Sequence, residues 1–305
     1  MSYLRLERIP WYRRALRSDH VAGWGLASPA IFLIGLFALF PIAWSVVLSF
    51  QQSDLLAPNP PWVGWSNYRQ LMSDPVFRRA VSNTVLYTAL FVPLSIVSGL
   101  AVAVAMNRRI RLISLYRTVV FLTLAVSTIS TAIMFLWLTE PTFGILNHAL
   151  RGVGVPPQGF LQDPGQAMYV IVAMTVWGWL GFVVVVYLAA LQGVPHELLE
   201  AAAIDGAGRW STFRNVTLPL LGPATLFLIV WLTVNALQLF DEVYLTTRGG
   251  PLYSTTVIVY FLFDQAFHLF RAGLAAAAAY VLFVGIVVVT LVQFWAGRRM
   301  VHYSS

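Results

Sequence analysis

Long apolar runs without charged residues dominate the hydrophobic pattern of this chain. Six of them reach the roughly 20 residues that an α-helix needs to cross the ~30 Å hydrocarbon core of a bilayer. Several such runs in one chain are typical of a polytopic helical membrane protein. The pattern therefore predicts an all-α protein with six transmembrane helices, at Leu26–Phe50, Ala80–Met106, Thr118–Thr139, Gln166–Gln192, Leu220–Phe240 and Ala272–Gly297.

A seventh apolar segment, Val257–Phe263, is too short to cross a bilayer, and we expect an interfacial or partly inserted helix there, outside the membrane. We find no internal repeat, so we expect a single transmembrane domain over residues 1–305. It would comprise a tail and entry segment over 1–25, six spans within 26–297 and a second tail over 298–305. The first apolar run is too long for the core of a signal peptide, so this span is expected to stay as an anchor.

The arginines divide unevenly between the two sides of the predicted bundle. Six spans place both termini on one side, and that side carries 13 of the 19 arginines. Because cytoplasmic connections are enriched in basic residues, both termini are predicted to lie in the cytoplasm. The 13 are Arg5, Arg8, Arg13, Arg14, Arg17, Arg108, Arg109, Arg111, Arg117, Arg209, Arg214, Arg298 and Arg299.

Composition supports a membrane protein and excludes several activities. Of the 305 residues, 59% are hydrophobic and only 10% are charged, with a mean hydropathy of +0.75. The chain has no Cys and no Lys, which removes thiolate metal sites and the lysine that a P-loop ATPase requires. The five His are well separated, so we predict no metal site and no catalytic residues. We assign the net charge of +7 to membrane topology rather than to nucleic-acid binding.

The connection between the fourth and fifth spans is unusually well specified as a helix. Pro195 suits the first helical position, Glu197 suits the first turn, and Gly206 suits a left-handed stop. Residues at i, i+3, i+4 and i+7 form a small, flat face that could enter a groove on another protein. The alternative is an amphipathic helix on the membrane surface, although such helices usually carry bulkier apolar residues. The face comprises Leu198, Ala201, Ala202 and Asp205.

This segment resembles the EAA signature of permease subunits in bacterial ATP-binding-cassette (ABC) importers. The match is the long form, with Glu200-Ala-Ala, then Asp205-Gly206 and then Leu218-Pro219. The resemblance implies the type I importer permease fold and a cytoplasmic coupling helix that docks on a separate ATPase. By the same resemblance, Glu200 would pair with a cation, Ala201 and Ala202 would give close contact, and Asp205, Gly206 and Pro219 complete the motif.

Other segments are similar to the carbohydrate-uptake branch of these importers: 62–68, 82–84 and 249–251. A narrower resemblance, to the first permease subunit of glycerol-3-phosphate and glycerophosphodiester importers, rests on 166–168, 202–208 and 292–294. The family implies four kinds of partner: a second homologous permease, a dimer of ATPase subunits, an extracytoplasmic substrate-binding protein and the lipid bilayer of a bacterial cytoplasmic membrane. ATP and Mg²⁺ would bind the ATPase, and this chain would need no cofactor.

Polar groups within or beside a span are candidates for the substrate path, because burying them in a membrane is costly. The fifth span and its exit provide five of them, and the fourth span adds two tryptophans that could stack on a polyol. Interfacial aromatic belts and hydrogen bonds between helices remain alternatives. The acidic pair Asp241–Glu242 lies at the end of the fifth span, and no arginine lies deep in any span. This charge pattern fits a neutral sugar or a zwitterion better than a bare anion, unless a partner subunit supplies cations. The residues are Trp177, Trp179, Asn235, Gln238, Asp241, Glu242 and Tyr244.

Two other classes remain as alternatives. An ion-coupled secondary transporter of a small polar solute would place carboxylates inside its spans, and the six predicted spans contain no Asp or Glu. A membrane-embedded enzyme would need paired carboxylates, clustered histidines or a nucleophile with its base, and the spans contain none of these. Both patterns favour a transport subunit that depends on a separate ATPase.

Overall fold

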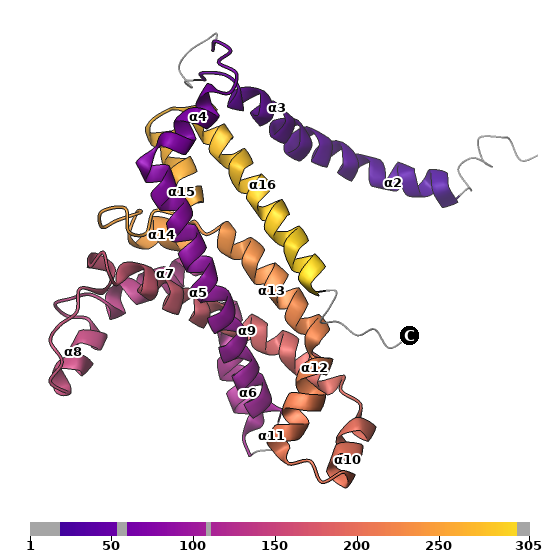
Figure 1. Cartoon of the computed structure of the whole chain (residues 1–305). Helices are drawn as coiled ribbons and strands as arrows, with labels where there is room; N and C mark the ends of the chain where they lie inside the picture. Colours follow the sequence, from indigo (N-terminus) through magenta and orange to yellow (C-terminus); the bar gives the residue numbers. More distant parts are fainter. Residues whose placement is uncertain (1–18, 54–59, 108–110, 298–305) are drawn as a thin grey trace, which may run out of the picture.

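The computed structural model describes residues 19–53, 60–107 and 111–297. This part of the chain is helical apart from loops and one isolated bridge between Gln51 and Trp62 (Figure 1). The α-helices are α2 (Asp19–Ile34), α3 (Phe40–Ser49), α4 (Ser66–Ser73), α5 (Pro75–Met106), α6 (Ile113–Leu122), α7 (Thr128–Leu138), α8 (Ile145–Gly152), α9 (Ala167–Gln192), α10 (His196–Ile204), α11 (Arg209–Thr212), α12 (Leu218–Leu220), α13 (Gly222–Leu237), α14 (Asp241–Thr246), α15 (Ile258–Phe263) and α16 (Ala272–Gly297).

Four of the predicted spans are continuous helices of sufficient length and apolarity to cross a membrane. They are Gly23–Ser49, where a π-helical turn joins α2 to α3, and the long helices α5, α9 and α16. The other two are bent pairs of helices, so six spans result when each pair is counted as one. The predicted number of spans therefore agrees with the structure, although two of the spans are not straight.

The third predicted span, Thr118–Thr139, is broken near its middle. The segment Ile113–Ala125 meets α7 at an angle of 102°. Val126 and Ser127 have extended backbones, and the Ser127 hydroxyl caps α7 by accepting a hydrogen bond from the Ser130 N–H at 3.2 Å. A new helix therefore begins inside a continuous hydrophobic run, and the Ser127 cap marks its start.

The fifth predicted span, Leu220–Phe240, is also divided. The segment Arg209–Leu220 meets α13 at 63°, and α13 ends at Leu237. Pro223 lies in the first turn of α13, where its missing N–H removes no helical hydrogen bond. Residues 209–217 form α11 and a π-helical turn that continues into α12.

Helices α5 and α9 form the centre of the bundle, and small residues allow their close approach. Gly99 of α5 lies directly against Val183 of α9, so a side chain at position 99 would overlap that valine. Gly181 similarly faces Thr123, whose hydroxyl accepts the Gly181 N–H at 3.1 Å. Close packing of this kind is a main source of helix association in membranes, where water does not drive it.

The first span lies away from the rest of the molecule along α2 and touches it along α3 (Figure 1). Its C-terminal end is held by the segment 62–68. The Asn67 amide donates to the Ser49 and Gln51 carbonyls at 2.8 and 2.9 Å, and the Phe50 ring packs against Trp62, Trp65 and Tyr68. One motif of the family resemblance therefore anchors the first span.

A second motif, 82–84, holds the loop that connects α14 to α15. The Asn83 amide donates to the Tyr253 and Thr256 carbonyls, both at 2.9 Å, and the Thr84 hydroxyl accepts the Ile258 N–H at 3.0 Å. The short apolar segment Val257–Phe263 contains the helix α15, as expected. This helix packs against α5 and α16 through the buried side chains of Ile258 and Phe261, and the ring centroids of Phe261 and Phe77 are 5.4 Å apart.

Candidate transport cavity and coupling helix

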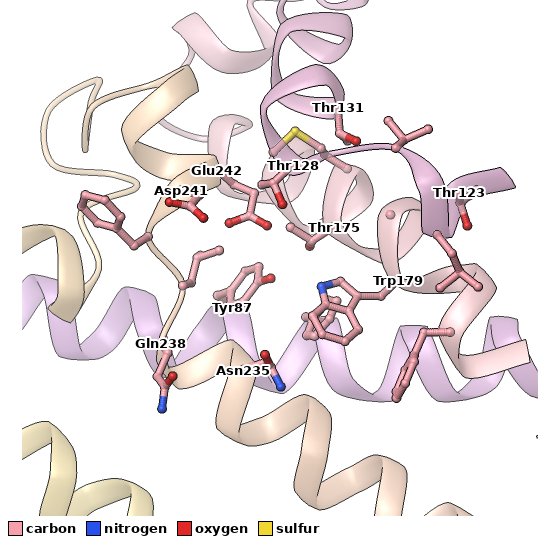
Figure 2. A pocket seen from close by; sticks show the side chains of 18 residues that line it. Tyr87, Thr123, Thr128, Thr131, Thr175, Trp179, Asn235, Gln238, Asp241 and Glu242 are labelled. Carbon is pink, nitrogen blue, oxygen red and sulfur yellow. The ribbon is translucent and has the colours of Figure 1, made fainter. Parts of the chain in front are cut away.

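A cavity of about 430 Å³ lies where the two broken spans face α5 and α9. The break between α6 and α7 contributes one wall, and the segment in which α13 ends and α14 begins contributes another. The 63° bend of the fifth span lies elsewhere, between α12 and α13. Figure 2 shows hydroxyl, amide and carboxylate groups from these elements around one space. Its lining comprises Tyr87, Phe91, Thr123, Leu124, Val126, Thr128, Thr131, Met174, Thr175, Gly178, Trp179, Phe182, Asn235, Gln238, Leu239, Phe240, Asp241 and Glu242.

One part of the lining is polar without being cationic. Thr128 and Thr131 come from the first turn of α7, and Thr175 comes from α9. The Thr175 hydroxyl donates within its helix to the Ile171 carbonyl at 2.9 Å and also hydrogen-bonds the Tyr87 side chain, which lines the same cavity (Figure 2). Hydroxyls of this kind can bond a solute that has many hydroxyl groups of its own.

Aromatic rings form the other part of the lining. Trp179 packs edge-on against Phe182 at 5.6 Å and against Phe91 at 6.5 Å, and Tyr87 stacks on Phe91 at 5.3 Å between ring centroids. These contacts hold the rings in place before a solute arrives. Fixed aromatic surface beside hydrogen-bonding groups is typical of a site for small polar molecules.

Five of the sequence-predicted path residues meet in this cavity: Trp179 from α9, Asn235 from α13, Gln238 after it, and Asp241 and Glu242 at the start of α14. The Asn235 amide donates to the Trp231 carbonyl at 2.8 Å, which fixes its side chain.

Two other predicted residues lie outside the lining. Trp177 packs against Phe135 at 6.2 Å, and Tyr244 packs between Phe240 and Phe263. Of the two tryptophans in α9, Trp179 is the one in the cavity.

The prediction missed the contributions of α5, α7 and most of α9. The only sequence signal was the run of hydroxyl residues over 127–131 inside an otherwise apolar span. Tyr87 and Thr175 gave no such signal, because neither α5 nor α9 has a distinct polar face that would mark one side of the helix. The missed polar residues are Tyr87, Thr123, Thr128, Thr131 and Thr175.

Helix α10 lies at one end of the molecule, far from α4 at the other end (Figure 1). It ends as the sequence predicts: Gly206 has φ +75°, and the Ala207 N–H reaches back to the Ala202 carbonyl at 2.9 Å. Pro195 occupies the N-cap rather than the first helical position. The left-handed turn at Gly206 sets the direction in which the chain leaves the helix.

The surface of α10 is available to a partner. Glu200, Ala201 and Asp205 are exposed, whereas Ala202 is half-buried. Ile204 is 86% exposed, and Trp210, which packs on Phe213, is 72% exposed. Pro219 is exposed in α12, at the bend that leads into α13.

Comparison with known proteins gives consistent results. The family model for the binding-protein-dependent transport system inner membrane component matches residues 84–302. The lactose transport permease LacF of Rhizobium radiobacter is 36% identical over 285 residues, covering 92% of this chain and 95% of LacF. The sn-glycerol-3-phosphate transport permease UgpA of Yersinia pestis is 32% identical over 280 residues, covering 92% and 95% respectively.

Solved structures show the same architecture. A chain from a bacterial ABC transporter that imports the acidic polysaccharide alginate superposes with a TM-score of 0.84 over 96% of this chain and 100% of the other, at 23% identity. Members of this family are membrane subunits, and ATP hydrolysis resides in a separate subunit. The chain thus belongs to the family of inner-membrane permease components of binding-protein-dependent ABC transport systems, and it has the type I importer permease fold.

Proposed function

We propose that this permease passes a sugar or a glycerol-3-phosphate-type solute through the cavity between its broken spans, driven through α10 by a separate ATPase. The observation that carries the proposal is the connection of the two sites by a short helical path. Helix α10 is followed by α11 and α12, and after a single bend α13 carries Asn235 to the cavity. A rigid displacement of α10 would therefore reach the cavity wall.

Movement of α10 can change access to the cavity only if the bundle has two conformational states. Nucleotide binding to the ATPase and cargo binding to the transporter must each favour one of these states over the other. The coupling residues would be Glu200, Ala201, Ala202, Asp205 and Gly206, with Pro219 at the bend. The exposed Ile204 and Trp210 extend this surface with apolar contacts. Tyr244, which packs on the lining residue Phe240, would support the substrate path from behind the lining.

The remaining parts of the machine would be supplied by other chains. A second homologous permease would complete the cavity, a dimer of ATPase subunits would bind ATP and Mg²⁺, and an extracytoplasmic binding protein would deliver the cargo. Support comes from the family itself and from a solved alginate transporter in complex with a periplasmic binding protein. The arginine distribution supports a bacterial cytoplasmic membrane with both termini in the cytoplasm.

The experiment that tests the coupling helix compares two glycines in the same turn. Gly206 has φ +75°, whereas Gly208 has φ −70°, and a Cβ added at either position would meet no neighbouring atom within 4 Å. Valine at 206 would face a penalty of about 1–2 kcal/mol or more for the left-handed backbone, whereas valine at 208 would not. Uptake and cargo-stimulated ATP hydrolysis should fall about tenfold for Gly206→Val alone, with membrane levels unchanged. Normal uptake by Gly206→Val would contradict the proposal.

A further inference from the structure

The ionisable side chains that line the cavity are acidic, and none is basic. Asp241 and Glu242 both line it, and its lining contains no Arg or His; the chain has no Lys at all. Figure 2 shows the two carboxylates on the same side as Thr128 and Thr175, directed toward the interior. Within the described residues, the one ion pair joins Asp264 to His268, so neither cavity carboxylate is neutralised by a neighbouring cation.

Apart from these two acids, the cavity lining consists of groups that suit an uncharged polyol. Threonine hydroxyls, the Asn235 and Gln238 amides and the rings of Trp179 and Phe182 can hold hydroxyl groups and apolar sugar faces. None of these groups attracts or rejects a charge strongly. The carboxylates therefore decide which charges the cavity accepts, because their field is concentrated by the surrounding low-dielectric walls.

We propose that Asp241 and Glu242 act as a charge filter, so that the permease accepts uncharged or cationic saccharides and rejects sugar phosphates and sugar acids. This inference rests on the proposed function in placing the cargo in the cavity. It goes further by choosing between the two solute classes, sugar and phosphorylated glycerol, that the relatives leave open. The two carboxylates are specificity-determining residues and take no part in chemistry.

The natural absence of cysteine makes the filter directly measurable. A single Thr128→Cys substitution places a thiol in the cavity of an otherwise Cys-free chain, beside Glu242 in Figure 2. The thiol is treated with two methanethiosulfonates of similar size, one carrying a trimethylammonium group and the other a sulfonate. The experiment uses right-side-out vesicles with the full-length chain in its assembled transporter. Val153→Cys, 75% exposed after α8, provides the reference thiol outside the cavity.

The measured quantity is the ratio of cationic to anionic modification rates at position 128, divided by the same ratio at position 153. We expect this normalised ratio to exceed one and to fall about fivefold or more in Glu242→Gln, with a further fall when Asp241→Asn is added. Gln238→Cys, on the other side of the lining, gives a second reporter should Thr128→Cys disturb the cap of α7.

Two results would overturn the charge filter. One is a normalised ratio at or below one in the chain with both acids, as when a second permease supplies compensating cations. The other is a ratio that the acid substitutions leave unchanged at both reporter positions. Labelling requires neither ATP hydrolysis nor transport, so its outcome is separate from that of the Gly206→Val uptake test.

Discussion

The most direct structural prediction concerns Asn83→Leu, which removes the clamp on the loop between α14 and α15. Asn83 is 5% exposed and donates two hydrogen bonds, to the Tyr253 and Thr256 carbonyls. Tyr253 is near the surface, so in the variant its carbonyl can bond water instead, and the loss of this hydrogen bond costs about 1 kcal/mol. Thr256 is buried, and its stranded carbonyl costs about 1–2 kcal/mol. The sum of roughly 2–3 kcal/mol corresponds to a roughly 30- to 150-fold increase in local opening.

Hydrogen exchange of the full-length protein in lipid nanodiscs measures this opening. The informative amides are those of Thr255, Thr256 and Ile258, whose hydrogen bonds lie within the loop or reach Thr84. Thr88→Val is the matched control, because the Thr88 hydroxyl bonds only the Thr84 carbonyl of its own helix. Unchanged protection in Asn83→Leu, or an equal loss in Thr88→Val, would refute the reasoning.

Two further predictions use pairs of residues that differ in position rather than in type. Trp179→Ala should weaken cargo-dependent uptake severalfold, whereas Trp177→Ala, which removes a ring outside the cavity, should have little effect; concentration-dependent uptake separates them. Gly181→Val should lower the thermal unfolding temperature of the purified protein, because its Cβ would lie 2.6 Å from the Thr123 hydroxyl, at a cost of about 1–3 kcal/mol. Gly178→Val, at a position where an added Cβ meets no atom within 4 Å, serves as the control; equal melting temperatures for the two variants would count against the close-packing argument.

The hydrophobic pattern located the spans well because the length of an apolar run is fixed by bilayer thickness. The same pattern carries no information on whether the run is straight. Leu124, Ala125 and Val126 are as apolar as their neighbours, yet the helix ends there. The local signal was Ser127 followed three residues later by Ser130, and it lacks the acidic residue of a full capping box. The bend of the fifth span was easier to expect, since Pro219 and Pro223 flank it.

The cavity was predicted only where polar residues interrupt a span. Asn235, Gln238, Asp241 and Glu242 were found because each is unusual in or beside an apolar helix. Trp177 and Trp179 could not be separated from sequence. Two residues along a helix correspond to a rotation of about 200°, so they face opposite ways, and α9 is apolar on all sides and gives no reference face. Tertiary packing alone reveals which tryptophan meets the cavity.

The two helix breaks explain why the cavity lies where it does. A backbone without helical hydrogen bonds is tolerated at membrane depth only where it is covered by protein or faces water. Val126, between α6 and α7, and Leu239 and Phe240, between α13 and α14, all line the cavity. Backbone groups at helix ends lack the regular intrahelical partner, and the cavity beside these segments gives them access to water or to a polar solute. The break between α6 and α7 thus gives the cavity a wall with hydroxyl groups, and the separate bend between α12 and α13 connects the α13 wall to α10, the helix that we propose a partner moves.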